Sequence, residues 1–475
     1  MPQHQISTIC PAIIRFETRF LCAIAHVSRI GARWHNASRA TPAPLPSTPV
    51  SELLQRTDRL WRGEASTAAP EYHPFAGPRM LEELAPGVAF YKAFVNVTAV
   101  KTEEGLVLID TGSFHPVAQK FCFDFVRGWN LERVHTAVYT HGHVDHAYGL
   151  PPFLAEAAAR RWAEPRIVGH ANVLPRMRRY VETAGYNTII NSRQFGTAMQ
   201  WPVAYHAPTE TFADALQFSV GGTRFELHHA KGETDDHAWV FLPQTRTICT
   251  GDLFIWAAPN AGNPQKVQRY AVEWAQALRK MAVLKPALLL PGHGLPIAGE
   301  SRVQEALLDT AAYLESLVTQ TLARLNAGDT MYEILDAVRP PAHLAEKPYL
   351  RPVYDEPAFI VRNLCRCFGG WYSGVPSELK PAPRNKLAAE VVALAGGMDR
   401  LLARAAEHLA SGDAHMAAHF VDWAVDADAS NAAAHAMRAK VYQHLLGTST
   451  STMSKGIYGA AARESAQKAG TGAKL

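Results

Sequence analysis

The sequence has few cysteines, and none of them is spaced as in a metal or redox motif. There are six in 475 residues, and no two of them form a C-x-x-C pair. This spacing excludes a cysteine-based zinc knuckle and a dithiol redox site. We therefore expect buried, reduced thiols, which favour a reducing compartment such as the cytoplasm.

Long apolar runs and an excess of one charge are also absent. No apolar run approaches the roughly 18 residues that a membrane-spanning helix needs. The net charge is only +4, and lysine and arginine form no block that would follow a phosphate backbone. With 48% apolar and 19% charged residues, the chain is typical of a soluble globular protein. We predict neither a membrane span nor a nucleic-acid partner.

Acidic residues are scarce at the N-terminus. Residues 1–43 contain five arginines but a single acid, Glu17. This bias resembles a mitochondrial transit peptide, although a disordered leader is the interpretation we favour. Residues 1–50 end in a Pro/Ala/Ser/Thr-rich linker and are predicted to be a disordered leader. The alternative is a targeting segment, which would place the protein in the mitochondrial matrix.

Short apolar runs and turn residues alternate through the middle of the chain. Strands are predicted at 88–94, 96–101 and 106–110, then a helix at 115–129 and a buried strand at 134–140. Strand and helix patterns continue to alternate up to about residue 299. We therefore predict a mixed α/β domain at 51–300.

Strand patterns stop after residue 301, and the remainder is rich in alanine and leucine. Residues 398–445 resemble tetratricopeptide-like helical hairpins, with turns at 411–413 and 428–431. Their apolar positions, including Leu401 and Leu445, are expected to face the α/β domain or another chain in part. We predict an all-α helical domain at 301–465 and a disordered tail at 466–475.

The segment "HGHVDH" concentrates four metal-ligand side chains in six positions at the end of a predicted strand. Imidazole and carboxylate groups suit zinc and related divalent ions, and loops after strands are where α/β folds place chemistry. A dinuclear site needs further ligands from loops after later strands. The residues in question are His141, His143, Asp145 and His146, followed by Glu233, Asp252 and His293.

The order of these motifs resembles the metallo-β-lactamase superfamily. The pattern H-x-H-x-D-H, then G-E-T, G-D and G-H, spans residues 87–299 together with the early strand "LVLIDTG". Glutamate at the third ligand position, Glu233, resembles the alkylsulfatase branch. The segment "GGWYSG" at 369–374, with the helical hairpins after it, looks like the alkylsulfatase dimerisation domain. The resemblance implies an αββα sandwich and a homodimer formed through the helices.

The resemblance also implies ligand roles and a mechanism. Two divalent ions, most simply Zn²⁺, would lower the pKa of a shared water and supply a hydroxide nucleophile. Asp110 would orient a ligand histidine, and Asp145 and Asp252 would be catalytic as well as ligating. Metal one would be held by His141, His143 and Glu233, metal two by Asp145, His146 and His293, and Asp252 would bridge both.

Polar residues in two segments are candidates for gripping the substrate. One segment is "INSRQFG", and the other follows the bridging carboxylate. His229 is a candidate proton donor, although strand packing explains it equally. The substrate-binding candidates are Asn191, Arg193, Asn260, Asn263, Lys266 and Arg269.

Three functions remain open from the sequence. The first is hydrolysis of alkyl sulfate esters. The second is hydrolysis of lactones, thioesters or phosphoesters by the same kind of site. The third is an inactive scaffold whose helical domain binds partners, which we disfavour because all seven ligand positions hold competent residues.

Overall fold

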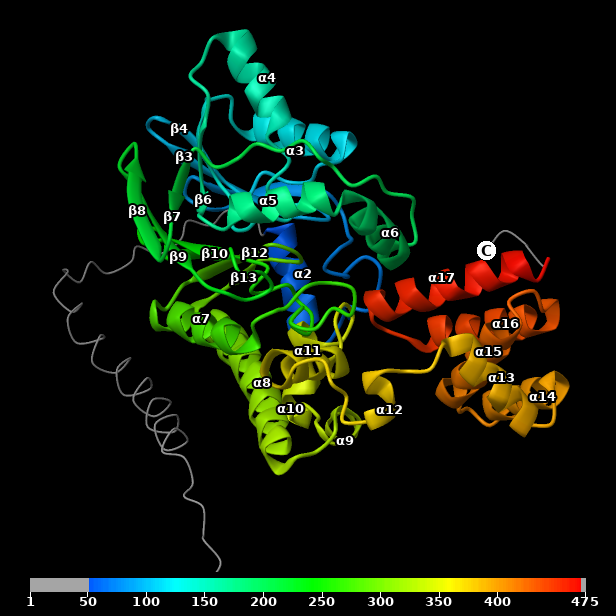
Figure 1. Cartoon of the computed structure of the whole chain (residues 1–475). Coiled ribbons are helices and arrows are strands. Elements are labelled where there is room, and N and C mark those ends of the chain that lie inside the picture. Colours follow the sequence, from blue (N-terminus) through cyan, green and yellow to red (C-terminus); the bar gives the residue numbers. More distant parts are fainter. Residues whose placement is uncertain (1–50, 471–475) are drawn as a thin grey trace, which may run out of the picture. The chain divides into compact units, whose positions relative to one another are not determined.

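The structure is a computed structural model that describes residues 51–470. The expected leader at 1–50 and residues 471–475 lie outside this part of the chain. Two β-sheets form its centre, with helices on both outer sides, and a run of helices follows (Figure 1). This arrangement confirms the predicted αββα sandwich followed by an all-helical region. No helix between residues 51 and 470 is long and apolar enough to cross a membrane.

The first sheet has seven strands in sequence order. Strands β1 to β4 form an antiparallel meander, and β4 to β7 run parallel. Strand β1 was not predicted, because "MLEELA" has two adjacent acids and no β-branched or aromatic residue. The strands are β1 (Met80–Ala85), β2 (Val88–Lys92), β3 (Val97–Thr102), β4 (Gly105–Ile109), β5 (Val134–Val138), β6 (Arg166–His170) and β7 (Glu210–Phe212).

The second sheet has six strands in the order β13-β12-β11-β10-β9-β8. Its pairs are antiparallel except for β11 and β12, which run parallel. Several of these strands are apolar along their whole length, which fits strands covered on both faces. They are β8 (Ala215–Val220), β9 (Thr223–His229), β10 (Ala238–Leu242), β11 (Thr247–Gly251), β12 (Leu288–Pro291) and β13 (Ile297–Ala298).

The inner faces of the two sheets share one apolar core. Phe90 and Val107 of the first sheet belong to the same cluster as Leu227 and Ile248 of the second. The other face of the first sheet packs on helices α3 and α4 through a separate cluster, and helices α7 and α8 cover the second sheet. The helices of this half are α2 (Glu52–Trp61), α3 (Pro116–Trp129), α4 (Pro151–Arg160), α5 (Val173–Glu182), α6 (Ala184–Phe195), α7 (Ala271–Val283) and α8 (Glu300–Ala327).

Only helices follow α8 in the described chain. The predicted turns at 411–413 and 428–431 separate α14, α15 and α16, and side chains of Asp413 and Asn431 cap the helices that follow them. The helices are α9 (Met331–Ala337), α10 (Ala342–Ala345), α11 (Pro357–Gly369), α12 (Pro376–Leu379), α13 (Arg384–Leu394), α14 (Met398–Ala410), α15 (Ala414–Ala427), α16 (Ala432–Thr448) and α17 (Thr452–Lys468).

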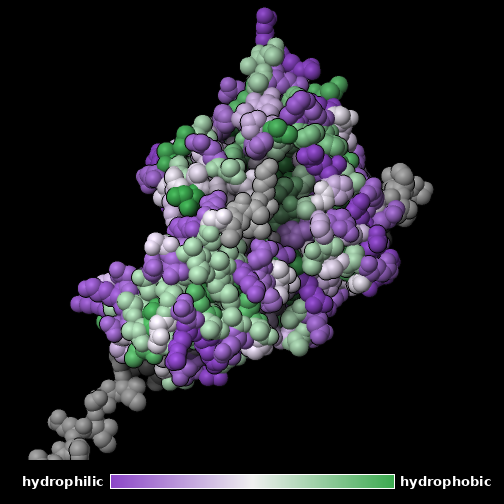
Figure 2. Space-filling view, turned by 90° about the vertical axis from the view of Figure 1, so that its right-hand side faces the viewer, coloured by the Kyte–Doolittle hydropathy of each residue, from purple (hydrophilic) through white to green (hydrophobic). Residues whose placement is uncertain are grey.

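The expected limit of the helical half needs one correction. Helix α17 continues to Lys468, so the disordered tail does not begin at residue 466. Leu401 and Leu445 belong to the part of the apolar surface that the helices bury themselves, in clusters made by α13 to α17. Figure 2 shows the side of the molecule on which these helices lie, and its surface mixes hydrophilic residues with weakly hydrophobic ones.

Candidate metal centre

The loop after β5 carries the histidine cluster, and a buried ion pair holds it in place. The backbone N–H of Gly142 donates to Oδ2 of Asp236 at 2.8 Å. Nε of Arg176 donates to the other oxygen of this carboxylate at 2.7 Å. Both side chains are buried, so each charge offsets the other. Helix α5, which supplies Arg176, therefore fixes the turn between the first two histidines.

Asp110 orients two of the histidine rings. Its carboxylate accepts hydrogen bonds from the Thr140 N–H at 2.8 Å, the Thr140 hydroxyl at 2.9 Å and Nδ1 of His146 at 2.8 Å. Because the Thr140 hydroxyl hydrogen points to Asp110, the Thr140 oxygen accepts from Nδ1 of His141 at 3.0 Å. In a neutral ring, Nε2 of each histidine then carries a lone pair, and that of His141 lies 2.8 Å from Nδ1 of His143.

His293, which follows β12, presents a lone pair to the same space. Its Nδ1 donates to the carbonyl oxygen of Phe94 at 2.6 Å, so its Nε2 carries no hydrogen. That Nε2 lies 3.2 Å from Nε2 of His146. Two lone pairs at this distance repel each other unless a cation is shared between them. A positive charge between the two nitrogens therefore explains the contact, either a proton on His146, whose pKa the carboxylates of Asp252 and Asp110 raise against the effect of burial, or a bound cation.

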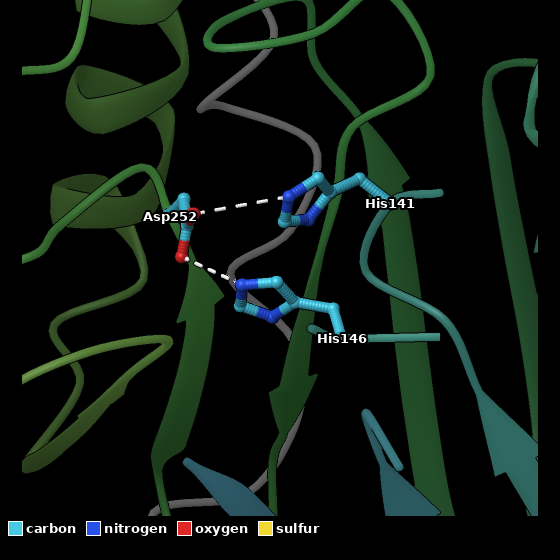
Figure 3. Close-up of side chains that lie close together, drawn as sticks. All are labelled: His141, His146 and Asp252. Atoms are coloured by element: carbon cyan, nitrogen blue, oxygen red, sulfur yellow. Dashed lines mark ion pairs between the residues drawn. The ribbon is translucent and has the colours of Figure 1, made fainter. Parts of the chain in front are cut away.

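Asp252, which follows β11, faces the rings of both His141 and His146 (Figure 3). Its Oδ2 is 3.8 Å from Nε2 of His141, and its Oδ1 is 3.3 Å from Nε2 of His146. The same Oδ1 is 3.5 Å from Nε2 of His293 and is buried without a hydrogen-bond donor. Asp252 thus contacts histidines from both predicted metal positions.

Ligand atoms of the seven predicted residues form three overlapping groups. Within each group the atoms lie within 4.8 Å of one another. Asp252 and His146 each belong to two groups, which joins the three into one centre. The groups are His141, His146 and Asp252; Asp145, His146 and His293; and His143, Glu233 and Asp252.

Glu233 completes the centre beside His143. Its Oε1 is 3.8 Å from Nδ1 of His143 and 2.6 Å from Nη1 of Arg269, and it accepts a hydrogen bond from Nδ2 of Asn260 at 2.5 Å. Burial raises the pKa of Glu233 to about 8, and the guanidinium of Arg269 opposes this rise. Its Oε2 is buried and has no donor.

The donor set fits divalent cations, because an ion would balance the carboxylate charges that, without it, raise the pKa of His146 against the effect of burial. Burial, with the neighbouring His146, holds the pKa of His141 well below its ordinary value. Burial, with Arg176, does the same for His143. Both rings are therefore neutral imidazoles, and the bare oxygens of Glu233 and Asp252 lack donors. Neutral imidazoles and carboxylates that face one another are the ligand set of zinc and similar ions.

Gly292 allows the loop before His293 to approach the centre closely. A Cβ atom at this position would lie 2.2 Å from Oδ1 of Asp252 and 3.0 Å from Cε1 of His146. Any side chain would therefore displace two predicted ligands. Close packing alone therefore explains why the "PGH" motif contains glycine at position 292, whether or not a metal is bound.

Two of the substrate-binding candidates hold a predicted ligand instead of facing open space. Arg269 and Asn260 both contact Glu233, and Nη1 of Arg269 also donates to the carbonyl oxygen of Asn260 at 2.9 Å. Both are buried. Their geometry positions Glu233, so the sequence interpretation of these two residues as substrate contacts finds no support here.

The other four candidates are placed differently. Nζ of Lys266 donates to Oδ1 of Asn191 at 2.9 Å, and burial of this ammonium lowers its pKa to about 7. Arg193 is exposed and donates to Gln265 at 2.9 Å. Asn263 is buried, and its backbone N–H donates to Asp355 at 3.2 Å. Lys266 and Asn191 thus form a part-buried pair, and the charges of Glu233 and Asp145 oppose the effect of burial on the pKa of Lys266.

His229 does not contact the predicted ligands. Its Nε2 lies 2.9 Å from the carbonyl oxygen of Asp235, and its ring stacks on His170 with centroids 3.8 Å apart. Strand packing therefore accounts for this residue, and its role as a proton donor loses its motivation.

Two supporting residues were missed because they look ordinary in the sequence. His237 is buried, stacks on His141 at 4.6 Å and accepts a hydrogen bond from the Asp252 N–H at 3.1 Å. Asp355 accepts hydrogen bonds from the backbone N–H groups of Gly262 and Asn263. The motif "GETDDH" gave a signal for His237, but nothing near Asp355 in the sequence marks it.

An aromatic wall lies next to His293. The Phe75 ring is 4.2 Å from His293 and 4.1 Å from Tyr354, and Phe94 is 5.8 Å from His293. Burial, with the carboxylates of Glu233 and Asp145, raises the pKa of Tyr354. Phe75 and Phe94 also line a cavity of about 530 Å³ that extends to Arg79.

Comparison with known sequences agrees with this geometry. The profile of the metallo-beta-lactamase superfamily matches residues 91–293, and that of alkyl sulfatase dimerisation matches residues 330–468. A linear primary-alkylsulfatase of Pseudomonas sp. (strain ATCC 19151) is 28% identical over 369 residues, which is 73% of this chain and 69% of the relative. The alkyl/aryl-sulfatase BDS1 of Saccharomyces cerevisiae is 25% identical over 74% of this chain and 58% of its own length.

A solved structure shows the same fold over most of the chain. The stereoselective inverting sec-alkylsulfatase Pisa1 from Pseudomonas sp. has a TM-score of 0.73 and 21% identity, covering 84% of this chain and 66% of that one. The residues matched by the two profiles contain the predicted ligands and the helical hairpins, respectively. The chain belongs to the metallo-β-lactamase superfamily and carries an alkyl sulfatase dimerisation domain, with alkylsulfatases among its relatives.

Proposed function

We propose that the protein hydrolyses alkyl sulfate esters at a dinuclear metal centre, most simply a zinc centre. The observation that carries this proposal is the joined set of seven donor side chains, in which Asp252 faces two histidine rings. Two divalent cations in this set would activate water and offset negative charge that develops on the ester oxygens.

The chain's own residues account for the orientation of the ligands. Asp110 and Phe94 direct Nε2 of His146 and His293 inward. Arg269 and Asn260 hold Glu233. These contacts preorganise the ligands, so little rearrangement is needed when a substrate arrives.

The surroundings of the centre fit an anionic group joined to an apolar one. Lys266 and the hydroxyl of Tyr354 provide hydrogen-bond donors for an anion. The charges of Glu233 and Asp145 raise the pKa of both groups, in Lys266 against the larger effect of burial. The rings of Phe75 and Phe94 lead from His293 to the 530 Å³ cavity, which provides apolar surface for a hydrocarbon chain. An alkyl sulfate combines these two properties.

Elemental analysis and one substrate panel test this proposal. We expect about two zinc or similar ions per chain and release of sulfate from alkyl sulfates. Hydrolysis of lactones, thioesters or phosphodiesters in place of sulfates would assign the second function. Absence of bound metal, with no activity restored by added zinc, would leave only the scaffold.

We further propose that the protein is a homodimer through the region of helices α11 to α13. Trp371 and Leu394 are 71% and 87% exposed, and Phe368, Leu379 and Leu387 are exposed nearby in the sequence. All five lie within the residues that match the dimerisation domain. Large apolar side chains concentrated in one segment indicate an interface.

Light scattering on a matched set of variants tests the interface. Trp371→Ser combined with Leu379→Ser should convert a dimer into a monomer. Leu131→Ser serves as the control, because Leu131 is equally exposed but lies before β5. A wild-type monomer, or a double variant that stays dimeric, would contradict this placement of the interface.

A further inference from the structure

The C-terminal helix α17 packs directly on helix α6 beside the candidate centre. A Cβ atom on Gly456 would lie 2.3 Å from the carbonyl oxygen of Gln194 and 2.6 Å from its Cα atom. The two helices therefore touch through their backbones, and only glycine fits at position 456. This contact joins segments that are more than 250 positions apart (456 − 194 = 262).

The start of α17 also holds the segment that carries Tyr354. The Ser451 hydroxyl donates to the carbonyl oxygen of Tyr354 at 2.7 Å, and the Thr452 N–H donates to that of Val353 at 3.0 Å. Met453 is fully buried in the same apolar cluster as Tyr354 and Phe75. Helix α17 thus fixes the Tyr354 backbone while it presses on α6.

Gln194 of α6 fixes the other end of the tyrosine. Its Nε2 donates to the Tyr354 hydroxyl at 3.0 Å, and both side chains are buried. The hydroxyl oxygen is therefore an acceptor in this contact, which leaves its own hydrogen free to be donated. Tyr354 lies close to the centre, because the Phe75 ring is 4.1 Å from the ring of Tyr354 and 4.2 Å from the ring of His293.

We propose that Gln194 and Gly456 are positioning residues through which α17 aims the Tyr354 hydroxyl at the anionic group of the substrate. Tyr354 itself would touch the substrate as a neutral hydrogen-bond donor. Phenols have an ordinary pKa near 10, so the hydrogen is present at neutral pH. This inference rests on the proposed function only in that the centre binds a tetrahedral anion.

Binding of inorganic sulfate by the zinc-loaded protein tests the inference without any turnover. We expect Tyr354→Phe and Gln194→Met each to weaken sulfate binding by about tenfold in calorimetric titrations, as for one hydrogen bond to a charged group. The double variant should lose no more than either single one, because both changes remove the same oriented donor. Metal content should stay unchanged in all three proteins.

Two further variants separate positioning from general stability. Gln194→Glu would accept the phenol hydrogen and add a negative charge, so it should weaken sulfate binding more than Gln194→Met. Gly456→Ala should separate α17 from α6 and also weaken binding. Gly447→Ala is its matched control, because Gly447 lies in α16 with open space around its Cα, and it should bind as the wild type does.

The outcomes distinguish this inference from the proposed function. If the losses of sulfate affinity in Tyr354→Phe and Gln194→Met add up in the double variant, Gln194 acts independently of Tyr354, and the inference is overturned. Failure of the wild type to bind sulfate would also overturn it. Sulfate binding with the expected pattern, but no hydrolysis of sulfate esters, would keep the positioning role and reject the proposed function.

Discussion

The loops of the two sheets and helices α9 to α17 of the C-terminal half both contain polar side chains that are at least partly buried, but in the described chain only the helices provide all buried side-chain polar atoms with hydrogen-bond partners. In the sheets' loops, buried polar atoms face one another without hydrogen-bond partners, as Glu233 and Asp252 do. In the hairpins, Asp422 is satisfied by both Arg438 and Tyr442. Among the described residues, helices α9 to α17 contain no buried side-chain polar atom without a partner. Unpaired buried acceptors, rather than burial itself, therefore mark where a ligand belongs.

The largest effect is expected from the carboxylate that joins the donor groups. Asp252→Asn should remove most bound metal and lower turnover by more than about a thousandfold, since even an outer partner of a ligand is worth about 10–100-fold. Elemental analysis and the substrate panel measure both effects. Asp422→Asn is the matched change in the hairpins and should leave metal content unchanged. Equal metal loss in both variants would abolish the contrast between the two regions.

Apolar truncation in the hairpins should affect stability alone. Leu445 is buried in the hairpin core, so Leu445→Ala should cost about 2–5 kcal/mol of unfolding free energy. Leu131→Ala, at an exposed position outside the proposed interface, should stay within about 0.5 kcal/mol. Urea unfolding measures both, and metal content reports on the centre. Loss of metal from folded Leu445→Ala protein would show that the regions are coupled more tightly than these contacts indicate.

A smaller effect is expected for Asp110, which hydrogen-bonds to a predicted ligand, His146. Asp110→Asn keeps the shape of the side chain but weakens its bonds to Thr140 and His146, so metal affinity should fall by about 10–100-fold. Competition with a chelator measures the affinity. The fold should be retained, which circular dichroism can check. Unchanged affinity would mean that Asp110 is not needed to orient His146.

The smallest effect concerns a buried cation of the first sheet. Burial lowers the pKa of Lys92 to about 7 from 10.5, while its Nζ donates to the carbonyl oxygen of Ala76 at 2.8 Å. Between pH 7 and pH 10.5, Lys92 therefore carries a proton in the unfolded chain but not in the folded one. The contribution of Lys92 to stability falls as the pH drops from 10.5 to 7.

Lys92→Met should flatten this pH dependence. Urea midpoints of the wild type and the variant at pH 7.5 and pH 9.5 provide the comparison. The wild type should gain more stability than the variant as the pH rises between these two values. Parallel changes in both proteins would show that Lys92 is charged in the folded state. Arg438, whose partner Asp422 offsets its charge, provides the contrasting case in the hairpins.

The strands and the donor set could be predicted because both depend on local patterns. Apolar runs ending in histidine or acidic residues placed His141, Asp252 and His293 at neighbouring strand ends, and the structure brings them together. The roles of Arg269 and Gln194 could not be predicted, because each depends on contacts between segments far apart in the chain. The sequence does not distinguish an arginine that holds a buried glutamate from an arginine that binds a substrate.

The contact between α17 and α6 has a consequence for synthesis of the protein. The ribosome completes every predicted ligand, up to His293, well before it reaches Ser451 and Gly456. A growing chain could therefore capture its metal ions while the Tyr354 side of the pocket is still unformed. Metal loading and competence to bind the substrate anion would then be separate events in time, and the second would wait for the last helix.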